Sequence, residues 1–199
     1  MKEKSSLIKA RGYWFLNVEL YPLTFVQKDP CRDETDHLST YIYTFFSPPT
    51  KLKYVIRAEY FSTNTFAIKF YAKRDKKLPA KYSRIINRGD AVNILLTAGN
   101  VLPLCLEYFP SASFALAGSR SFDPFSNTVE SFQRNQRFRI YSELIKRYVG
   151  TELFEHISYE QISCYLLLNK KNTDLETKRV EIEESFKNTY DELLNVEFD

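Results

Sequence analysis

The chain has 199 residues and carries 28 lysine and arginine against 25 aspartate and glutamate side chains, a formal net charge of +3. A composition that is 44% hydrophobic and 16% aromatic excludes an intrinsically disordered protein, and only five glycines argue against a glycine-looped nucleotide-binding fold. A domain of this length buries roughly 70% of its unfolded surface and needs no disulfide or metal to hold its core.

Cysteine usage and hydropathy favour a cytoplasmic protein. The three cysteines are widely spaced and form no Cys-x-x-Cys pattern, which is typical of reduced thiols. The sequence has no run of 18 apolar residues, and its first six residues precede no apolar segment. We therefore expect no transmembrane helix, no signal peptide and no membrane partner.

Charge is distributed unevenly along the chain. Residues 172–199 contain nine acidic and three basic side chains, a net charge of −6, which leaves +9 on residues 1–171. A basic body favours a polyanionic partner such as RNA or DNA. The acidic segment either shields that body, binds a different partner, or is simply the solvated face of a helix.

The first half of the chain is predicted to form strands. Residues 11–27 contain strand-like runs interrupted at Pro22, and residues 28–40 have the polarity of a loop. Three further strands are predicted over 41–46, 52–61 and 65–72. Ser62-Thr63-Asn64 is a hairpin-type connection between the last two. In the last strand Phe66, Ile68 and Phe70 alternate along one face.

In the second half, helices alternate with strands. A buried helix is predicted to begin after Asp90 as its N-cap and to be kinked or split at Gly99 and Pro103. Next come, in order, a strand over 112–117, a polar loop over 119–130, a helix over 131–149 that stops at Gly150, a strand over 161–168 and a helix over 173–195.

This order predicts an α+β fold, a mainly antiparallel sheet with about three helices packed on it. Residues 1–171 are expected to form one domain, with N-terminal strands over 11–27 and a core over 41–171, and residues 172–199 to form an acidic C-terminal helix. The connection from the 112–117 strand to the 161–168 strand is predicted to be a parallel crossover.

Arginines gather at the start of the 131–149 helix. On a helical wheel centred on Tyr141, Arg134 and Arg137 continue the stripe that faces the core, whereas Arg139 points to water. Arg120, just after the preceding strand, can approach from the opposite side. We call Arg120, Arg134, Arg137 and Tyr141 the arginine corner.

The arginine corner needs anionic partners, because cations at a helix N-terminus oppose the helix dipole and buried charges must be paired. Asp90, Glu107 and Asp123 are candidate internal partners. A bound phosphate or carboxylate is the alternative, since arginine forks and free N–H groups both suit an anion. Both alternatives stay open at this point.

Short motifs surround the arginine corner: Asn87-Arg88-Gly89-Asp90, Tyr108-Phe109-Pro110, Gly118-Ser119 and Arg139-Ile140-Tyr141. Together with Arg134 and Arg137 they resemble an uncharacterised family of small proteins from Bacteroidota, over roughly residues 41–170. The chain departs from the family pattern where Arg88 interrupts Asn-Gly-Asp and where the 119–130 loop is longer. The resemblance implies the fold and the arginine corner, and no activity.

Enzyme motifs are mostly missing. The sequence contains no zinc-site pattern, nucleophile elbow, P-loop or dinucleotide fingerprint, so no metal or cofactor is expected. His156 is more typical of a surface or capping residue than of a catalytic one. Cleavage of RNA by arginine and tyrosine side chains alone stays open, so the sequence does not decide whether the protein is an enzyme.

Two functions compete. The first is a small cytosolic protein directed at nucleic acid, of the toxin or phage-defence type, which binds or cleaves RNA with the arginine corner. The alternative is a non-enzymatic interaction module whose last helix docks on a protein partner or a second copy. Its apolar seam consists of Ile182, Phe186, Tyr190 and Leu193. We favour the first.

Overall fold

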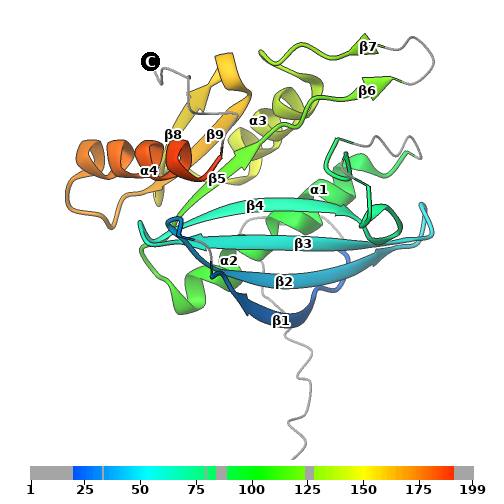
Figure 1. Cartoon of the computed structure of the whole chain (residues 1–199), viewed down its shortest axis with the longest axis horizontal. Helices are drawn as coiled ribbons and strands as arrows, with labels where there is room; N and C mark the ends of the chain where they lie inside the picture. The colour runs from blue at the N-terminus through cyan, green and yellow to red at the C-terminus, as the bar shows by residue number, and fades with distance from the viewer. Residues whose placement is uncertain (1–19, 33, 79, 84–88, 124–127, 191–199) are drawn as a thin grey trace, which may run out of the picture.

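A seven-stranded sheet forms the centre of the computed structural model, which describes residues 20–32, 34–78, 80–83, 89–123 and 128–190 (Figure 1). The strand order is β1-β2-β3-β4-β5-β9-β8. The strands are β1 (Thr24–Pro30), β2 (His37–Ser47), β3 (Leu52–Phe61), β4 (Thr65–Ala72), β5 (Ser113–Ala117), β8 (Phe154–Tyr159) and β9 (Cys164–Asn169). A separate two-stranded ribbon consists of β6 (Phe122–Asp123) and β7 (Thr128–Val129).

Helices cover both faces of this sheet. They are α1 (Ala91–Gly99), α2 (Val101–Tyr108), α3 (Gln136–Tyr148) and α4 (Leu175–Thr189), with 3-10 turns η1 (Lys73–Asp75) and η2 (Glu160–Ile162). Every neighbouring pair of strands is antiparallel except β4 and β5. The predicted α+β class and mainly antiparallel sheet are therefore confirmed.

The N-terminal strands differ from the prediction in their bounds. The strands predicted over 52–61 and 65–72 match β3 and β4, whereas the one predicted over 41–46 extends from His37 to Ser47. The predicted loop over 28–40 is shorter, because β1 continues to Pro30 and pairs with β2. Residues 11–19 lie outside the described residues.

The predicted parallel crossover was wrong in its location. β5 pairs antiparallel with β9, and β8, which precedes β9 in sequence and lies beyond it at the edge of the sheet, was not predicted. The parallel pair is instead β4 with β5, and α1 and α2 form the connection between them. The chain thus crosses one connection earlier than expected, which places the first residues of β4 beside the first residues of β5.

The apolar segment after Asp90 forms two helices. Asn100 separates α1 from α2, so the predicted split lies next to Gly99, and Pro103 sits in the first turn of α2 where its missing N–H does no harm. Within the described residues, Ala91–Tyr108 is one stretch long and apolar enough to cross a membrane. Half of this stretch is buried inside the fold.

Two hydrophobic clusters lie on opposite faces of the sheet. Phe66 and Ile68 face α1, α2 and α3, as their predicted alternation requires, while Ala67 between them faces α4. Phe114 and Phe66 are fully buried in the first cluster and stack with ring centroids 5.8 Å apart. The helices therefore pack against both faces of the sheet at β4, β5 and β9.

Both long helices are shorter than predicted. The helix expected over 131–149 begins at Gln136 and ends at Tyr148, with Val149 as C-cap and Gly150 following it. The helix expected over 173–195 ends at Thr189, because Tyr190 is already extended. Asp174 caps α4 by accepting a hydrogen bond from the Thr177 backbone N–H at 3.0 Å.

Candidate functional site

The sheet divides where β4 and β5 part. Their ladder joins Thr65 with Ser113, Phe66 with Phe114 and Ala67 with Ala115, and it ends there. β4 then continues along β3 while β5 continues along β9, so the two strands diverge (Figure 1). The carboxyl ends of two parallel strands that separate are a favoured place for ligands in open sheets. We call this point the fork.

A hollow of about 500 Å³ occupies the fork, and we call it the main hollow. Arg137 and Tyr141 line it from α3 on one side of the sheet, and Lys69 and Tyr190 line it on the side of α4. Because residues from both sides take part, the hollow lies in the gap of the sheet itself. Arg120 and Phe132 complete its wall beyond the end of β5.

A close contact fixes the start of α3 against the end of β5. Asn135 is the N-cap: its side-chain oxygen accepts from the Phe138 backbone N–H at 2.9 Å, and its amide donates to the Gly118 carbonyl. A side chain at Gly118 would come within 2.8 Å of the Phe138 nitrogen, so only glycine fits there. The predicted Gly-Ser strand end thus has a structural reason.

The turn before α3 is also held from η2. Arg134 has a left-handed backbone with φ of 48°, and its N–H donates to the Glu160 carbonyl at 3.0 Å. The Asn135 N–H donates to the Ser163 hydroxyl at 3.0 Å, and Ser163 donates to the Phe132 carbonyl at 2.6 Å. The helix that carries Arg137 therefore starts from a backbone fixed on two sides.

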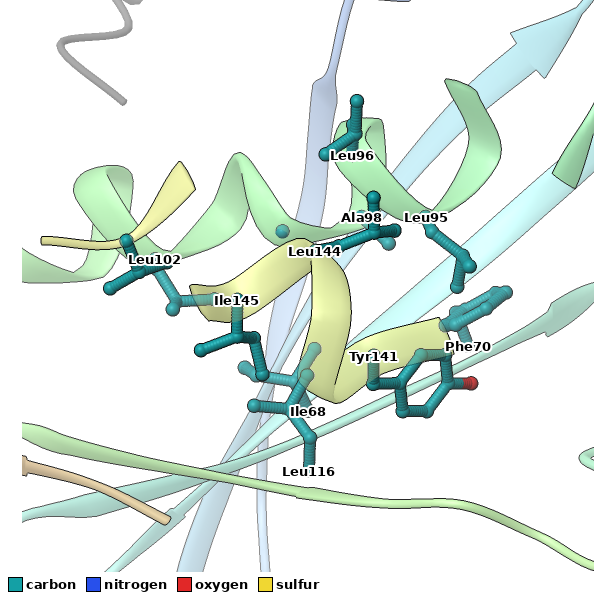
Figure 2. A pocket seen from close by; sticks show the side chains of 12 residues that line it. Ile68, Phe70, Leu95, Leu96, Ala98, Leu102, Leu116, Tyr141, Leu144 and Ile145 are labelled. Carbon is teal, nitrogen blue, oxygen red and sulfur yellow. The ribbon is translucent and has the colours of Figure 1, made fainter. Parts of the chain in front are cut away.

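Arg137 and Tyr141 lie together in the wall of the main hollow. The Arg137 guanidinium donates to the Tyr82 carbonyl and hydrogen-bonds to the Tyr141 hydroxyl. Burial raises the pKa of Tyr141, against the opposing effect of the Arg137 cation. Figure 2 shows Tyr141 beside Phe70 at one end of a small apolar pocket, with its hydroxyl directed away from the aliphatic side chains.

Arg120 is exposed at the rim of the main hollow. Its guanidinium carbon lies 5.7 Å from the centre of the Phe132 ring, a cation–π contact. Within the described part of the chain Arg120 forms no ion pair. An exposed guanidinium beside an aromatic face can bind a phosphate and still support a stacked ring.

Lys69 is neutralised by an acid at the side of the hollow. Its ammonium lies 2.7 Å from the Glu59 carboxylate and 4.1 Å from the centre of the Tyr190 ring. Tyr190 donates from its hydroxyl to Glu59 at 2.9 Å, and Arg57 lies 3.3 Å from the same carboxylate. Burial alone would raise the pKa of Glu59, but these three partners hold it below its usual value.

The arginine corner is only partly assembled. The structure brings Arg120, Arg137 and Tyr141 together, because all three line the main hollow. Arg134 does not, because it precedes the helix and the wheel does not apply to its backbone. Its guanidinium pairs with Glu160 at 3.4 Å, and both side chains are largely exposed, so the ion pair contributes little.

The predicted internal partners also differ. Asp90 is buried and accepts hydrogen bonds from the Tyr21 hydroxyl at 2.9 Å and from Ser47, so it serves the N-terminal segment rather than the arginines. It stands at the N-cap position of α1 but makes no capping bond with its side chain. Glu107 is exposed on α2, and the side chain of Asp123 lies outside the described residues.

The seam of the last helix faces its own sheet. Ile182 is 1% exposed and Phe186 is 9% exposed, and both pack against residues of β3, β4, β8 and β9. Tyr190 packs beside them and reaches the main hollow. Leu193 lies outside the described residues. The alternative reading placed a partner on this seam, and Ile182 and Phe186 are not accessible to one.

Lys69, Tyr82 and Phe132 were not among the predicted site residues. Lys69 lies at an alternate position of a strand, where a lysine usually points to water, and Tyr82 and Phe132 lie in irregular segments. The only sequence signal was the charged residue inside the apolar run Phe66–Phe70. His156 lies on β8 and hydrogen-bonds to the Tyr165 hydroxyl at 3.1 Å, away from the hollow.

Comparisons of the chain with models of protein families, with curated proteins and with solved structures found no match. The resemblance of residues 41–170 to a Bacteroidota family therefore stays a prediction. The function is inferred from the geometry of the fork and from the charges around it.

Proposed function

We propose that the protein binds single-stranded nucleic acid, RNA or DNA, in the main hollow. The observation that carries the proposal is the position of Arg120 and Arg137 on one hollow of about 500 Å³ together with Phe132 and three tyrosines. Cations that attract the phosphates and aromatic faces that stack on bases are the two elements of single-strand binding sites. Both elements meet at the fork.

The location of the hollow favours a single strand over a duplex. The hollow lies in the gap between β4 and β5, so a ligand must enter between two structural elements rather than rest on a flat surface. An unpaired base can enter such a gap and stack on an aromatic ring, whereas a base inside a duplex cannot. The +9 charge of residues 1–171 supports attraction of a polyanion to the same domain.

The tyrosines of the hollow suit binding better than proton abstraction. Burial, reinforced by the negative charge of Glu59, raises the pKa of Tyr82 to about 12. Its hydroxyl therefore stays protonated at neutral pH and can only donate a proton in a hydrogen bond or accept one with its lone pairs. Tyr141 has a raised pKa as well. We accordingly propose binding without cleavage as the function of this site.

The Arg120→Ala/Arg137→Ala double variant is expected to bind a labelled 12-nucleotide strand at least tenfold more weakly than the wild type. Each arginine that contacts a phosphate contributes about 0.7 to the slope of log affinity against log salt concentration. The slope should therefore fall by about 1.4 in the double variant. Fluorescence anisotropy across a salt series, with oligo-RNA and oligo-DNA of the same sequence, measures both quantities.

A matched control removes the same amount of charge from arginines near the start of α3 that do not line the hollow. Arg134 and Arg139 are exposed and do not line the hollow, so the Arg134→Ala/Arg139→Ala variant should change affinity less than threefold. Circular dichroism of both variants verifies that they are folded. Absence of wild-type binding at low salt, or an equal loss in the two double variants, would contradict the proposal.

Truncation after Tyr190 separates this function from the interaction module. It removes four acidic and no basic residues, together with Leu193, and leaves every described residue of the hollow in place. Nucleic-acid affinity is expected to stay the same or to increase, since repulsion of the phosphates decreases. Anisotropy measures the affinity, and light scattering measures the oligomeric state. If neither protein binds nucleic acid and the truncation abolishes an oligomer, the interaction module is favoured.

A further inference from the structure

A second hollow of about 250 Å³ adjoins the main hollow, and the two share four lining residues. The shared residues are Phe70, Tyr82, Arg137 and Tyr141. These four side chains form a common wall. The second hollow continues past that wall toward the start of α1 and the first turn of α3.

The two hollows follow one another along β4. The main hollow contacts Ile68, Lys69 and Phe70, and the second contacts Phe70, Tyr71 and Ala72. A step of two residues along a strand is about 7 Å. Among the described residues, the ladder of β4 with β5 ends at Ala67, so this edge of β4 runs past both hollows.

The second hollow offers the same kinds of group as the first. Tyr71 and Tyr82 line it, and the Lys81 ammonium lies 5.2 Å and 5.1 Å from the centres of these two rings. Ser121 lines it too, and its buried hydroxyl has no hydrogen-bond partner among the described residues. A buried hydroxyl without a partner carries a desolvation cost that a polar ligand group can relieve.

Arg137 is the cation of the common wall. It donates to the Tyr82 carbonyl and hydrogen-bonds to Tyr141, which fixes the guanidinium between the two hollows. An anionic group that joins two ring-sized moieties matches this arrangement, with the anion at the guanidinium and one moiety on each side. The phosphodiester of a dinucleotide has this form.

We propose that the two hollows take two consecutive nucleosides of one strand, with the phosphodiester that links them at Arg137. This inference rests on the proposed function and adds the register of the ligand. The main hollow takes one nucleoside and the second hollow takes its neighbour, so the smallest ligand that satisfies the site is a dinucleotide.

Competition against a labelled 12-nucleotide strand tests the register with the full-length protein. The competitors are AMP, the dinucleotides ApA and UpU, and ApA with a neutral methylphosphonate link. At least one dinucleotide is expected to compete at a concentration at least tenfold below that of AMP. The neutral link should lose most of this advantage, and in Arg137→Ala the charged and neutral forms of ApA should compete equally.

The outcomes distinguish the two proposals. If the labelled strand binds but AMP competes as well as both dinucleotides, or if the charge of the link has no effect, the two-nucleoside register is wrong and the proposed function stands. If the labelled strand does not bind, the proposed function itself fails. Should Arg137→Ala not fold, the comparison of charged with neutral ApA on the wild type still decides the register.

Discussion

Replacing Glu59 by alanine is expected to lower the free energy of unfolding by about 3 kcal/mol at neutral pH. Glu59 is 7% exposed and its carboxylate holds Arg57, Lys69 and the Tyr190 hydroxyl at once. Removing one partner of a buried ion pair leaves the others without compensation and costs about 3–5 kcal/mol. Urea denaturation of the two proteins measures the difference.

The lower end of that range applies because the cations are less buried than the acid. The side chains of Arg57 and Lys69 are each 29% exposed, so both can regain some water when the carboxylate is lost. Arg57 also keeps its bond to the Thr40 hydroxyl at 3.1 Å. The Tyr190 hydroxyl loses the carboxylate that accepts its hydrogen bond at 2.9 Å.

The contribution of Glu59 depends on pH in a definite direction. Its pKa in the folded protein lies below the value of about 4.3 that an unfolded glutamate has. Stability from this group is therefore fully present above pH 5 and is lost as the pH falls through the unfolded and then the folded pKa. The Glu59→Gln variant should lack this part of the acid destabilisation while it keeps the side-chain volume.

Stability curves at pH 7, 5, 4 and 3.5 test the assignment. The gap between the wild type and Glu59→Gln should narrow steadily below pH 5, because protonation makes the two side chains alike. A gap that stays constant over this range would mean that the carboxylate charge is not what holds Lys69 and Arg57. The difference in stability between the two proteins would then not come from the charge of Glu59.

The local pattern of the sequence was sufficient for the central hairpin. β3 and β4 begin and end where the alternation of apolar residues and the Ser62-Thr63-Asn64 connection predict, since hairpin register follows from neighbouring residues. β8 contains Phe154, Ile157 and Tyr159, aromatic and β-branched residues that favour a strand, so part of its signal was present and was missed.

The partner of β5 could not be predicted in the same way. Whether a strand pairs with β4, with β9 or with both depends on contacts between residues far apart in sequence, and no local pattern encodes it. The fork exists because β5 pairs with β4 over only three residues, whereas its pairing with β9 continues to Ala117. The main hollow therefore could not be derived from the sequence, although Arg120, Arg137 and Tyr141 were predicted to share one site.

One capping residue explains why α3 starts later than predicted. The prediction placed Arg134 inside the helix, but Asn135 is a strong N-cap residue that precedes the apolar run, and the chain enters it through a left-handed Arg134. Moving the start from 131 to 136 leaves the angular positions of Arg137 and Tyr141 unchanged. It removes only Arg134 from the stripe, and for that reason most of the arginine corner survived.

Asn135 is expected to contribute both to the stability of the fold and to the position of the arginines in the main hollow. Replacing Asn135 by alanine is expected to cost about 2–3 kcal/mol, since it removes an N-cap bond worth about 1 kcal/mol and leaves the buried Gly118 carbonyl without its donor. Asn135 is 2% exposed, so water cannot simply replace either bond. Thermal or urea denaturation measures the loss.

The Asn135→Ser variant separates the two bonds. Serine caps a helix about as well as asparagine, but it is too short to reach the Gly118 carbonyl. We expect it to recover about 1 kcal/mol of the loss in Asn135→Ala. Equal stability of the two variants would mean that the tie to Gly118, and not the cap, accounts for the whole effect.

Nucleic-acid binding by these variants, measured where each is fully folded, decides whether the tie also serves the site. Asn135 fastens the helix of Arg137 to the strand end that leads to Arg120, so both variants are expected to bind several-fold more weakly than the wild type. Arg139→Ala, which leaves the tie intact, should not. If stability falls and affinity stays the same, the two arginines act independently, and the close contact between Gly118 and α3 only holds the fold.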